Sequence, residues 1–304
     1  MTLPKQIQIL ERGWLSSNNI LLAGRDGNAM IDAGYVSHAP QTLALVEHAL
    51  NGGRVDRLIN THCHSDHMGG NAAVQTKWQC RTSIPAGEAP LIERWDEDEL
   101  LLAFADQQAE RFRIDDTIAA GDTLRMGDLD WQVLAAPGHD LHALMLYSPD
   151  ERVLISGDAL WQSGFGVIFP ALFGRASAFA ETRATLDSIA ALEVRAVIPG
   201  HGAPFDDVEA ALARAYKRLD GFERDITRLA QHCVKVMLAF SLLDRREMRL
   251  DGLPAYVASV PIIVRINRDF LGMTPEALAE YLVTELERAG AARRRHDMLV
   301  PFHS

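Results

Sequence analysis

Short apolar strands and helical segments alternate along the first two thirds of the chain. Residues 18–32, NNILLAGRDGNAMID, hold two apolar runs that meet at Asp26-Gly27, which is a hairpin signal. Further strands are predicted at 57–60, 79–84, 122–125, 131–136, 142–148, 152–156 and 195–198. Helices are predicted at 38–51, 69–76 and 177–192, with a helical insertion at about 88–113. This mixture of strands and helices indicates an α/β domain.

From about residue 205 the pattern becomes mostly helical. Residues 206–231 carry apolar side chains at helical spacing, from Val208 to Leu229. Another helix is predicted at 274–289, because Thr274-Pro275-Glu276 makes a good helix start. The pattern therefore predicts a mixed domain over residues 1–205 and a mostly helical extension over residues 206–304.

Composition narrows the class of protein. With 48% hydrophobic and 23% charged residues, the 304-residue chain is neither disordered nor a disulfide scaffold. A formal charge of −11 argues against broad binding to nucleic acid or anionic membranes. The scattered cysteines, Cys63, Cys80 and Cys233, suit a reducing compartment. No leader and no apolar run of ~20 residues is visible, so we expect a cytoplasmic protein without a membrane partner.

A dense group of metal-ligating residue types follows the strand predicted at 57–60. His62, His64, Asp66 and His67 stand within six residues. Imidazole and carboxylate are ligands of first-row metals. In an extended backbone His62 and His64 point to the same side, while Asp66 and His67 follow as the chain turns into the next helix. With 11 histidines in the chain, a chance cluster of this kind is improbable, so the sequence predicts a metal site here.

Further motifs stand at the ends of predicted strands, in a fixed order. The group above lies in THCHSDHMGG at 61–70, and it is followed by PGH at 137–139, SGDA at 156–159 and PGHG at 199–202, with IDAG before them at 31–34. This order resembles the metallo-β-lactamase superfamily over about residues 15–205. The resemblance implies an αββα sandwich, in which two mixed sheets face each other between outer helices. The metal site would lie at one edge of the sandwich.

The resemblance also implies a binuclear metal site in which no ligand position is missing. One ion would be held by His62, His64 and His139. The other would be held by Asp66, His67 and His201, with the carboxylate of Asp158 bridging the two. Two Zn²⁺ ions are the expected cofactors, and the ligand types do not exclude iron or manganese.

Two nearby positions allow more than one role. Asp32 is expected either to hydrogen-bond near the ligands or to be a plain turn residue at a strand end. Asp140 and His142 are close in sequence to His139, and His142 is expected to be structural or to support the ligands from outside.

This site implies a metal-dependent hydrolase of thioesters, esters or lactones that acts on a small-molecule substrate. A hydroxide shared by the two metals would attack the carbonyl, with Asp66 and Asp158 as catalytic residues. The run GDALWQSGFG at 157–166 is similar to that of the hydroxyacylglutathione hydrolase branch. One alternative is phosphodiester cleavage of the nuclease type, which the acidic charge disfavours. The other is a non-catalytic, ligand-binding regulator, which the complete ligand set disfavours.

Three weaker features leave alternatives open. The aromatic residues after Asp158 form either an apolar substrate wall or part of the core; they are Trp161, Phe165, Phe169 and Phe173. The basic run 293–295 is expected to be a solvated face and not a nucleic-acid contact. Residues 206–304 and the insertion at 88–113 are expected to cover the metal edge, or to provide the contact of a homodimer.

Overall fold

The computed structural model describes residues 2–302, and its chain forms two compact units. The first unit holds the residues up to Asp96 together with Gln108–Asp220. The second unit holds Glu97–Gln107 together with the residues from Gly221 onward. By packing, residues 206–220 therefore belong with the first unit. The functional division expected at residue 205 stays a prediction.

The first unit contains a six-stranded mixed sheet. Its strands run in the order of the sequence: β1 Ile7–Leu10, β2 Asn19–Gly24, β3 Gly27–Ile31, β4 Arg57–Ile59, β5 Arg81–Pro85 and β6 Asp116–Ile118. The first three strands pair antiparallel, with the hairpin turn at Asp26-Gly27 as predicted. From β3 to β6 the strands pair parallel, so the carboxyl ends of β3 and β4 meet at one edge.

A five-stranded sheet forms the other half of the first unit. Its strand order is β11 Ala196–Pro199, β10 Val153–Gly157, β9 Leu144–Ser148, β8 Leu129–Ala135 and β7 Thr123–Met126. Only β10 and β11 pair parallel, and the remaining neighbours are antiparallel. Because β9 runs opposite to both β8 and β10, the carboxyl ends of β8, β10 and β11 lie at the same edge.

Alternating side chains divide the apolar residues of the first sheet between two cores. Ile20 and Leu22 of β2 join the cluster that fills the space between the sheets, which also contains Trp131 of β8. Leu21 points to the other face and packs with Val46 and other residues of the helical layer. A strand that is buried on both faces has apolar residues at every position. This explains the continuous apolar run ILL at 20–22.

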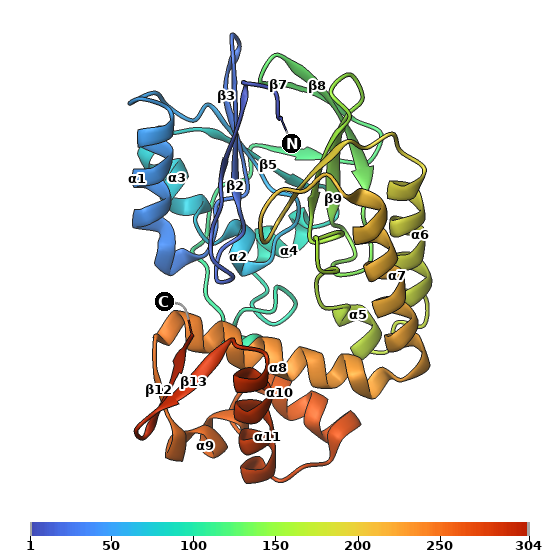
Figure 1. The fold of residues 1–304 in the computed structure, drawn as a ribbon. Coiled ribbons are helices and arrows are strands. Elements are labelled where there is room, and N and C mark those ends of the chain that lie inside the picture. The colour runs from blue at the N-terminus through green and yellow to red at the C-terminus, as the bar shows by residue number, and fades with distance from the viewer. Residues whose placement is uncertain (1, 303–304) are drawn as a thin grey trace. The chain divides into compact units, whose positions relative to one another are not determined.

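Helices cover the outer faces of the two sheets (Figure 1). The helices α1 and α3 lie against the first sheet, and α6 and α7 lie beside the second. The helical segments here are η1 Val36–His38, α1 Ala39–Ala49, α2 Ser65–Met68, α3 Asn71–Trp78, α4 Ala89–Arg94, α5 Phe169–Leu172, α6 Ala178–Ala190 and α7 Val208–Arg224. This arrangement confirms the predicted αββα sandwich.

The insertion at 88–113 is less helical than predicted. Its helix α4 ends at Arg94, because Trp95 adopts a left-handed conformation with φ of 56°. After that, only the single turn η2, Ala103–Ala105, is helical. The abundance of Leu, Ala and Glu indicated helix propensity, but propensity is a weak guide where tertiary contacts decide the backbone.

The second unit is mostly helical, as predicted, and also holds a small sheet. Its helices are α8 Ile226–Arg245, η3 Leu250–Gly252, α9 Leu253–Val257, α10 Pro261–Ile266, the π-helical η4 Asn267–Leu271 and α11 Pro275–Arg288. The antiparallel strands are β12 Met248–Arg249, β14 Met298–Pro301 and β13 Ala292–Arg295, in that spatial order. Thr274 caps α11 as expected from the sequence, since its side chain accepts a hydrogen bond from the N–H of Ala277.

The helical spacing predicted over 206–231 corresponds to two helices, α7 and α8. Asp225 has an extended backbone, with φ of −149° and ψ of 96°, and its carboxylate accepts a hydrogen bond from the N–H of Thr227 over 3.0 Å. Asp225 is thus the N-cap of α8 and ends the run of α7. The apolar spacing continues across the break, so it gave no sign of the interruption.

Among residues 2–302, one helix, α8, has the length and apolar composition of a membrane span. Half of that span is buried within the protein. Its buried residues, which include Cys233, Met237 and Leu238, belong to the interior of the second unit. A buried apolar helix of this kind is typical of a globular core.

Candidate metal centre

The loops that carry the candidate ligands converge at one edge of the sandwich. Asp32 follows β3, and the segment His62–His67 follows β4. From the facing sheet, His139, Asp158 and His201 come shortly after β8, β10 and β11. Since the carboxyl ends of these strands share an edge in each sheet, the fold brings together residues that are far apart in the sequence.

The first group of candidate ligands consists of His62, His64 and His139. One donor atom from each lies within 4.8 Å of the others, as a shared metal ion would require. Nδ1 of His64 lies 2.8 Å from Nε2 of His139. Nε2 of His62 is buried and has no hydrogen-bond partner in the described structure. An unpaired buried nitrogen is costly, and a metal ion would satisfy it.

The second group consists of Asp66, His67 and His201. Oδ2 of Asp66 lies 2.9 Å from Nε2 of His201 and 3.8 Å from Nε2 of His67. Nε2 of His67 is also buried without a hydrogen-bond partner in the described structure. The three donor atoms again fall within 4.8 Å of one another.

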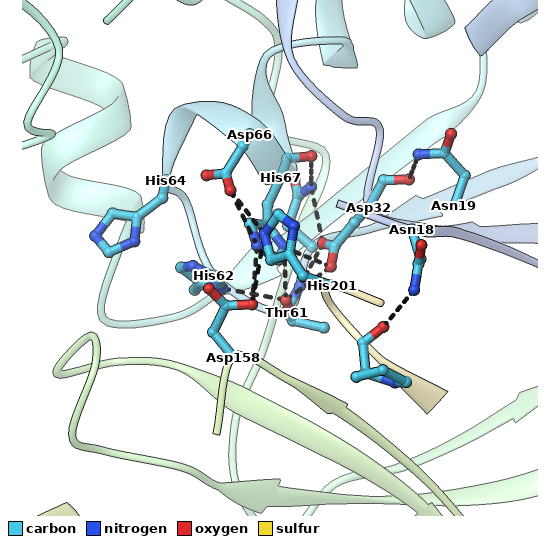
Figure 2. Close-up of polar contacts among 12 residues, drawn as sticks. Asn18, Asn19, Asp32, Thr61, His62, His64, Asp66, His67, Asp158 and His201 are labelled. Carbon is cyan, nitrogen blue, oxygen red and sulfur yellow. Dashed lines mark hydrogen bonds and ion pairs between the residues drawn. The ribbon is translucent and has the colours of Figure 1, made fainter. Parts of the chain in front are cut away.

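The carboxylate of Asp158 stands between the two groups. Its Oδ1 lies 3.3 Å from Nε2 of His67, and its Oδ2 lies 3.4 Å from Nε2 of His139. Figure 2 shows Asp66 and Asp158 pointing toward the same imidazoles from opposite sides. One oxygen thus faces each group, which is the arrangement that a bridging ligand needs.

The outward nitrogens of the histidines have partners of their own. Nδ1 of His67 donates to Oδ2 of Asp32 over 2.8 Å, and Nδ1 of His139 donates to the carbonyl of Val167 over 2.6 Å. A proton held on the outer nitrogen leaves the lone pair on the inner nitrogen, which can then bind a metal. The donor set and its outer partners therefore fit first-row divalent metal ions.

Asp32 has a definite place in this site. Its side chain is buried and accepts hydrogen bonds from the N–H and the hydroxyl of Thr61, over 2.9 and 2.8 Å. Through these bonds and the one from His67, Asp32 ties the end of β3 to the loop after β4. Of the two roles expected from the sequence, the structure favours support of the ligands.

Asparagines that the sequence analysis did not single out also hold the ligand loops. The side chain of Asn60 donates to the carbonyl of His67 over 3.2 Å, and it is hydrogen-bonded to Asn71. Asn18, which directly precedes β2, donates to the carbonyls of Pro199 and Gly202 and thereby holds the loop that carries His201 (Figure 2). In the sequence, Asn18 and Asn60 are ordinary polar residues next to apolar strands, since Asn18 precedes β2 and Asn60 follows β4.

Burial and neighbouring charges set the protonation of the metal-free histidines. Burial, reinforced by the surrounding histidines, lowers the pKa of His62 well below its usual value. Burial and His139 lower the pKa of His64 to about 4. Burial also works against the charge on His67, but Asp32, Asp158 and Asp66 outweigh it and raise the pKa of His67 well above its usual value. His62 and His64 thus offer free lone pairs at neutral pH, whereas a metal must displace a proton from His67.

A second carboxyl pair, Glu88 and Asp140, lies beside His64. Burial, together with the Asp140 carboxylate, raises the pKa of Glu88 well above its usual value. Oδ2 of Asp140 lies 3.8 Å from Nε2 of His64. Glu88 was missed because it stands 52 positions before Asp140, inside a segment expected to be an ordinary helix.

The other residues considered in the sequence analysis differ in their burial and in their contacts with the candidate ligands. His142 is exposed and, among the described residues, is not one of the possible metal ligands. Phe165 and Phe169 are buried, and Phe169 packs its ring against His64 and His139. Trp161 is half-buried and donates its indole N–H to Oδ1 of Asp158 over 3.2 Å. Gly200 must be glycine, because a Cβ there would overlap the Asp158 carboxylate.

Sequence comparisons agree with this geometry. The family model of the metallo-beta-lactamase superfamily matches residues 12–201. A hydroxyacylglutathione hydrolase of Rhodopseudomonas palustris is 32% identical over 133 residues, which are 43% of this chain and 44% of that protein. A hydroxyacylglutathione hydrolase of Nitrosococcus oceani is 34% identical over 120 residues, which are 38% of each chain. The matches thus span less than half the length of these two relatives.

Solved structures resemble the whole chain. A metallo-beta-lactamase family protein from Thermus thermophilus has a TM-score of 0.59 at 18% identity, covering 99% of this chain and 100% of that one. A beta-lactamase domain protein from Burkholderia ambifaria has a TM-score of 0.58 at 22% identity, covering 99% and 94%. At these identities the likeness concerns the fold.

Proposed function

The chain belongs to the metallo-beta-lactamase superfamily, and from the site that it carries on this fold we propose that it is a metal-dependent hydrolase of thioesters, esters or lactones. One observation carries the proposal. Seven His and Asp side chains aim donor atoms at two adjoining points, and two of the buried histidine nitrogens have no hydrogen-bond partner in the described structure. A site of that kind is organised for metal ions and not for packing.

We propose two divalent ions, with zinc as the first choice. His62, His64 and His139 would hold one, and Asp66, His67 and His201 the other, with Asp158 between them. When bound, such ions lower the pKa of a shared water and polarise a carbonyl oxygen. The ligand types also suit iron and manganese, so the identity of the metal has to be measured.

The protein's own groups would position the reactants. The side chain of Asp66 is 14% exposed and that of Asp158 is 6% exposed, so Asp66 is the more solvent-accessible carboxylate of the two. A carboxylate there can accept a hydrogen bond from the attacking water and orient it. Asp158 is held by the indole N–H of Trp161 and by the imidazoles around it. Since these groups are already in place, little reorganisation is needed when the substrate arrives.

A thioester is the first substrate class to test. The curated relatives are named hydroxyacylglutathione hydrolases, and thioester cleavage is the corresponding reaction. Because the matches cover less than half of those proteins, the proposal covers the thioester bond and leaves the thiol part of the substrate open. Esters and lactones share the same electrophilic carbonyl and remain within the proposal.

The basic run at 293–295 gives little support to a nuclease. Arg294 pairs with Glu280 over 2.6 Å, and Arg295 pairs with Glu247 over 3.3 Å. Arginines already paired with carboxylates have less charge to offer to phosphates. We therefore propose a small-molecule substrate in preference to nucleic acid.

The cytoplasmic location, and the role of residues 206–304 in enclosing the substrate or forming a homodimer, stay predictions.

The proposal is tested by metal analysis combined with a substrate panel. Protein purified without chelator is analysed by mass spectrometry, then assayed on thioesters, lactones, phosphodiesters and a chromogenic cephalosporin. Hydrolysis of a thioester, ester or lactone, abolished by chelation and restored by metal, is expected. His62→Ala should be inactive, and His142→Ala, which alters a histidine outside the ligand groups, should be active. Cleavage of phosphodiesters alone would favour a nuclease, and no turnover by metal-loaded protein would favour a binding protein.

A further inference from the structure

An exposed indole lies directly against the candidate metal centre. The side chain of Trp14 is 53% exposed, although it stands on the loop between β1 and β2 in the first unit. Its ring stacks on the imidazole of His201, with centroids 5.4 Å apart and planes only 7° apart. A large apolar ring left open to water at such a place is unfavourable unless something covers it. One face of Trp14 is used by His201, and much of the remainder is available.

Trp161 meets the same imidazole from another direction. Its ring lies 5.3 Å from that of His201 and 5.3 Å from that of Trp14, edge-on in both cases. The two indoles and His201 therefore form a corner of three aromatic rings. This corner adjoins Asp158, because the indole N–H of Trp161 donates to Oδ1 of that carboxylate.

The loop that carries Trp161 is firmly held. The backbone of Trp161 exchanges two hydrogen bonds with Gly164, over 2.6 and 3.2 Å. Arg214 of α7 donates to the carbonyl of Gln162 over 2.7 Å. A ring fixed in this way loses little conformational entropy when a ligand contacts it, which favours recognition by shape.

The cation nearest to Trp14 along the chain is already engaged. The guanidinium of Arg12 donates to the side chains of Asn19, Thr42 and Gln41, over 2.7, 2.7 and 2.9 Å. Arg12 is therefore held in place as part of the framework. The chemistry that this corner offers is that of aromatic faces and edges.

We propose that Trp14 and Trp161 form a subsite that binds a flat apolar group of the substrate, such as an aromatic ring of the acyl part, beside the reacting carbonyl. This inference rests on the proposed hydrolase function, and it names the substrate class more closely. Aromatic rings associate in stacked or edge-to-face geometry, and the corner presents both orientations to an incoming ring. A group held there would be adjacent to His201 and Asp158, where the carbonyl is expected to react.

The test compares two thioesters of one thiol, the phenylacetyl and acetyl esters of N-acetylcysteamine, with the metal-loaded full chain. Trp14→Ala should lower kcat/KM for the phenylacetyl thioester by roughly three- to tenfold. The acetyl thioester should change less than twofold, and Trp14→Phe should restore most of the selectivity. Phe302→Ala is the matched control, because Phe302 is a 47% exposed aromatic residue in the second unit.

A binding measurement separates failure of the subsite from failure of the proposed function. Calorimetric titration with naphthalene-1-acetate, and with acetate as its small counterpart, requires no turnover. Wild-type protein should bind naphthalene-1-acetate more tightly than acetate, and Trp14→Ala should lose that preference. If no carbonyl substrate is turned over but this preference is present and depends on Trp14, the hydrolase proposal fails and the subsite stands. An equal loss of kcat/KM for both thioesters in Trp14→Ala, or a binding preference unchanged in that variant, would overturn the subsite. Trp14 would then only shield the imidazole of His201 from solvent.

Discussion

Oδ2 of Asp32 lies 2.8 Å from Nδ1 of His67, and both side chains are buried. The carboxylate at the end of β3 thereby fixes which nitrogen of His67 carries a proton. The other nitrogen, Nε2, faces Asp66 and Asp158, and its lone pair becomes available there when a metal displaces the second proton of His67. The relationship makes Asp32 a positioning residue whose effect on the metal passes through His67.

Replacing Asp32 should weaken metal binding although Asp32 is not itself a candidate ligand. Outer partners of metal ligands are typically worth 10–100-fold in affinity, and we expect Asp32→Ala to lower affinity for one ion by about that range. Asp32→Asn keeps an acceptor oxygen and should lose less. The measurement is competition with a chromogenic chelator, and Asp26→Ala, in the exposed turn between β2 and β3, is the matched control. Unchanged affinity in Asp32→Ala would refute the positioning role.

Asp158→Ala should damage both metal sites, whereas His139→Ala should damage mainly one. The reason is that Asp158 has one oxygen near His67 and the other near His139, while His139 belongs to the first group only. We expect close to two ions per chain in the wild type, close to one in His139→Ala and fewer in Asp158→Ala. Metal content is read by mass spectrometry after circular dichroism has established that both variants are folded. Loss of one ion in each variant would contradict the bridge.

The candidate ligands could be predicted because the signal is local. Short strands such as β4 end in polar residues of unusual type, and no packing role explains so many histidines after RLIN. The strands themselves could be predicted since burial on both faces leaves runs such as ILL at 20–22. Parallel pairing of β3 with β4 and of β10 with β11 then places their carboxyl ends at one edge.

Features that depend on distant contacts could not be predicted. Glu88 matters because the fold sets it beside Asp140, and Trp14 because it stacks on His201 from far away in the sequence. Asp225 interrupts a helical apolar pattern that continues on both sides of it. In each case the residue type is ordinary for its segment, and only the tertiary arrangement gives it a role.

Glu88 should make stability depend on pH in a recognisable direction. Its folded pKa is raised well above the ordinary 4.5, so the folded protein binds a proton that the unfolded chain has released. This contribution to stability is complete below about pH 4.5 and is lost as the pH rises through the folded pKa, by at most about 1.4 kcal/mol per pH unit. Glu88→Gln has no such proton to lose, so its stability relative to wild type should increase with pH.

The experiment for Glu88 is urea unfolding of metal-free protein between pH 5 and pH 8. Using metal-free protein removes the competition between protons and metal at the histidines. Glu93→Gln, at an exposed position of α4, the helix that Glu88 directly precedes, should show no such trend. A stability difference between Glu88→Gln and wild type that is constant with pH would show that Glu88 is ionised in the folded state.

Cutting the chain after residue 205 should yield an insoluble product, although the sequence predicts a domain boundary there. The cut removes the part of α7 that packs in the first unit, where Ala211, Ala215 and Leu219 are buried. The cut also leaves residues 97–107 without their packing partners. Asp106 loses its ion pair with Arg245, at 2.8 Å, and its hydrogen bond from the hydroxyl of Tyr256, at 2.9 Å. Both losses expose surface that is covered in the whole protein.

A matched series of truncations tests this reasoning about the two units. The chain cut after Asp220, with residues 97–107 replaced by a short Gly-Ser linker, keeps the whole of the first unit and removes the whole of the second. We expect it to be the most soluble of three products, ahead of the chain cut after Asp220 with residues 97–107 retained, and ahead of the chain cut at 205. Size-exclusion chromatography and metal content give the readout, because the seven candidate ligands all lie in the first unit. A soluble, monomeric, metal-binding product from the cut at 205 would show that the first unit folds without α7, and would support the boundary predicted from the sequence.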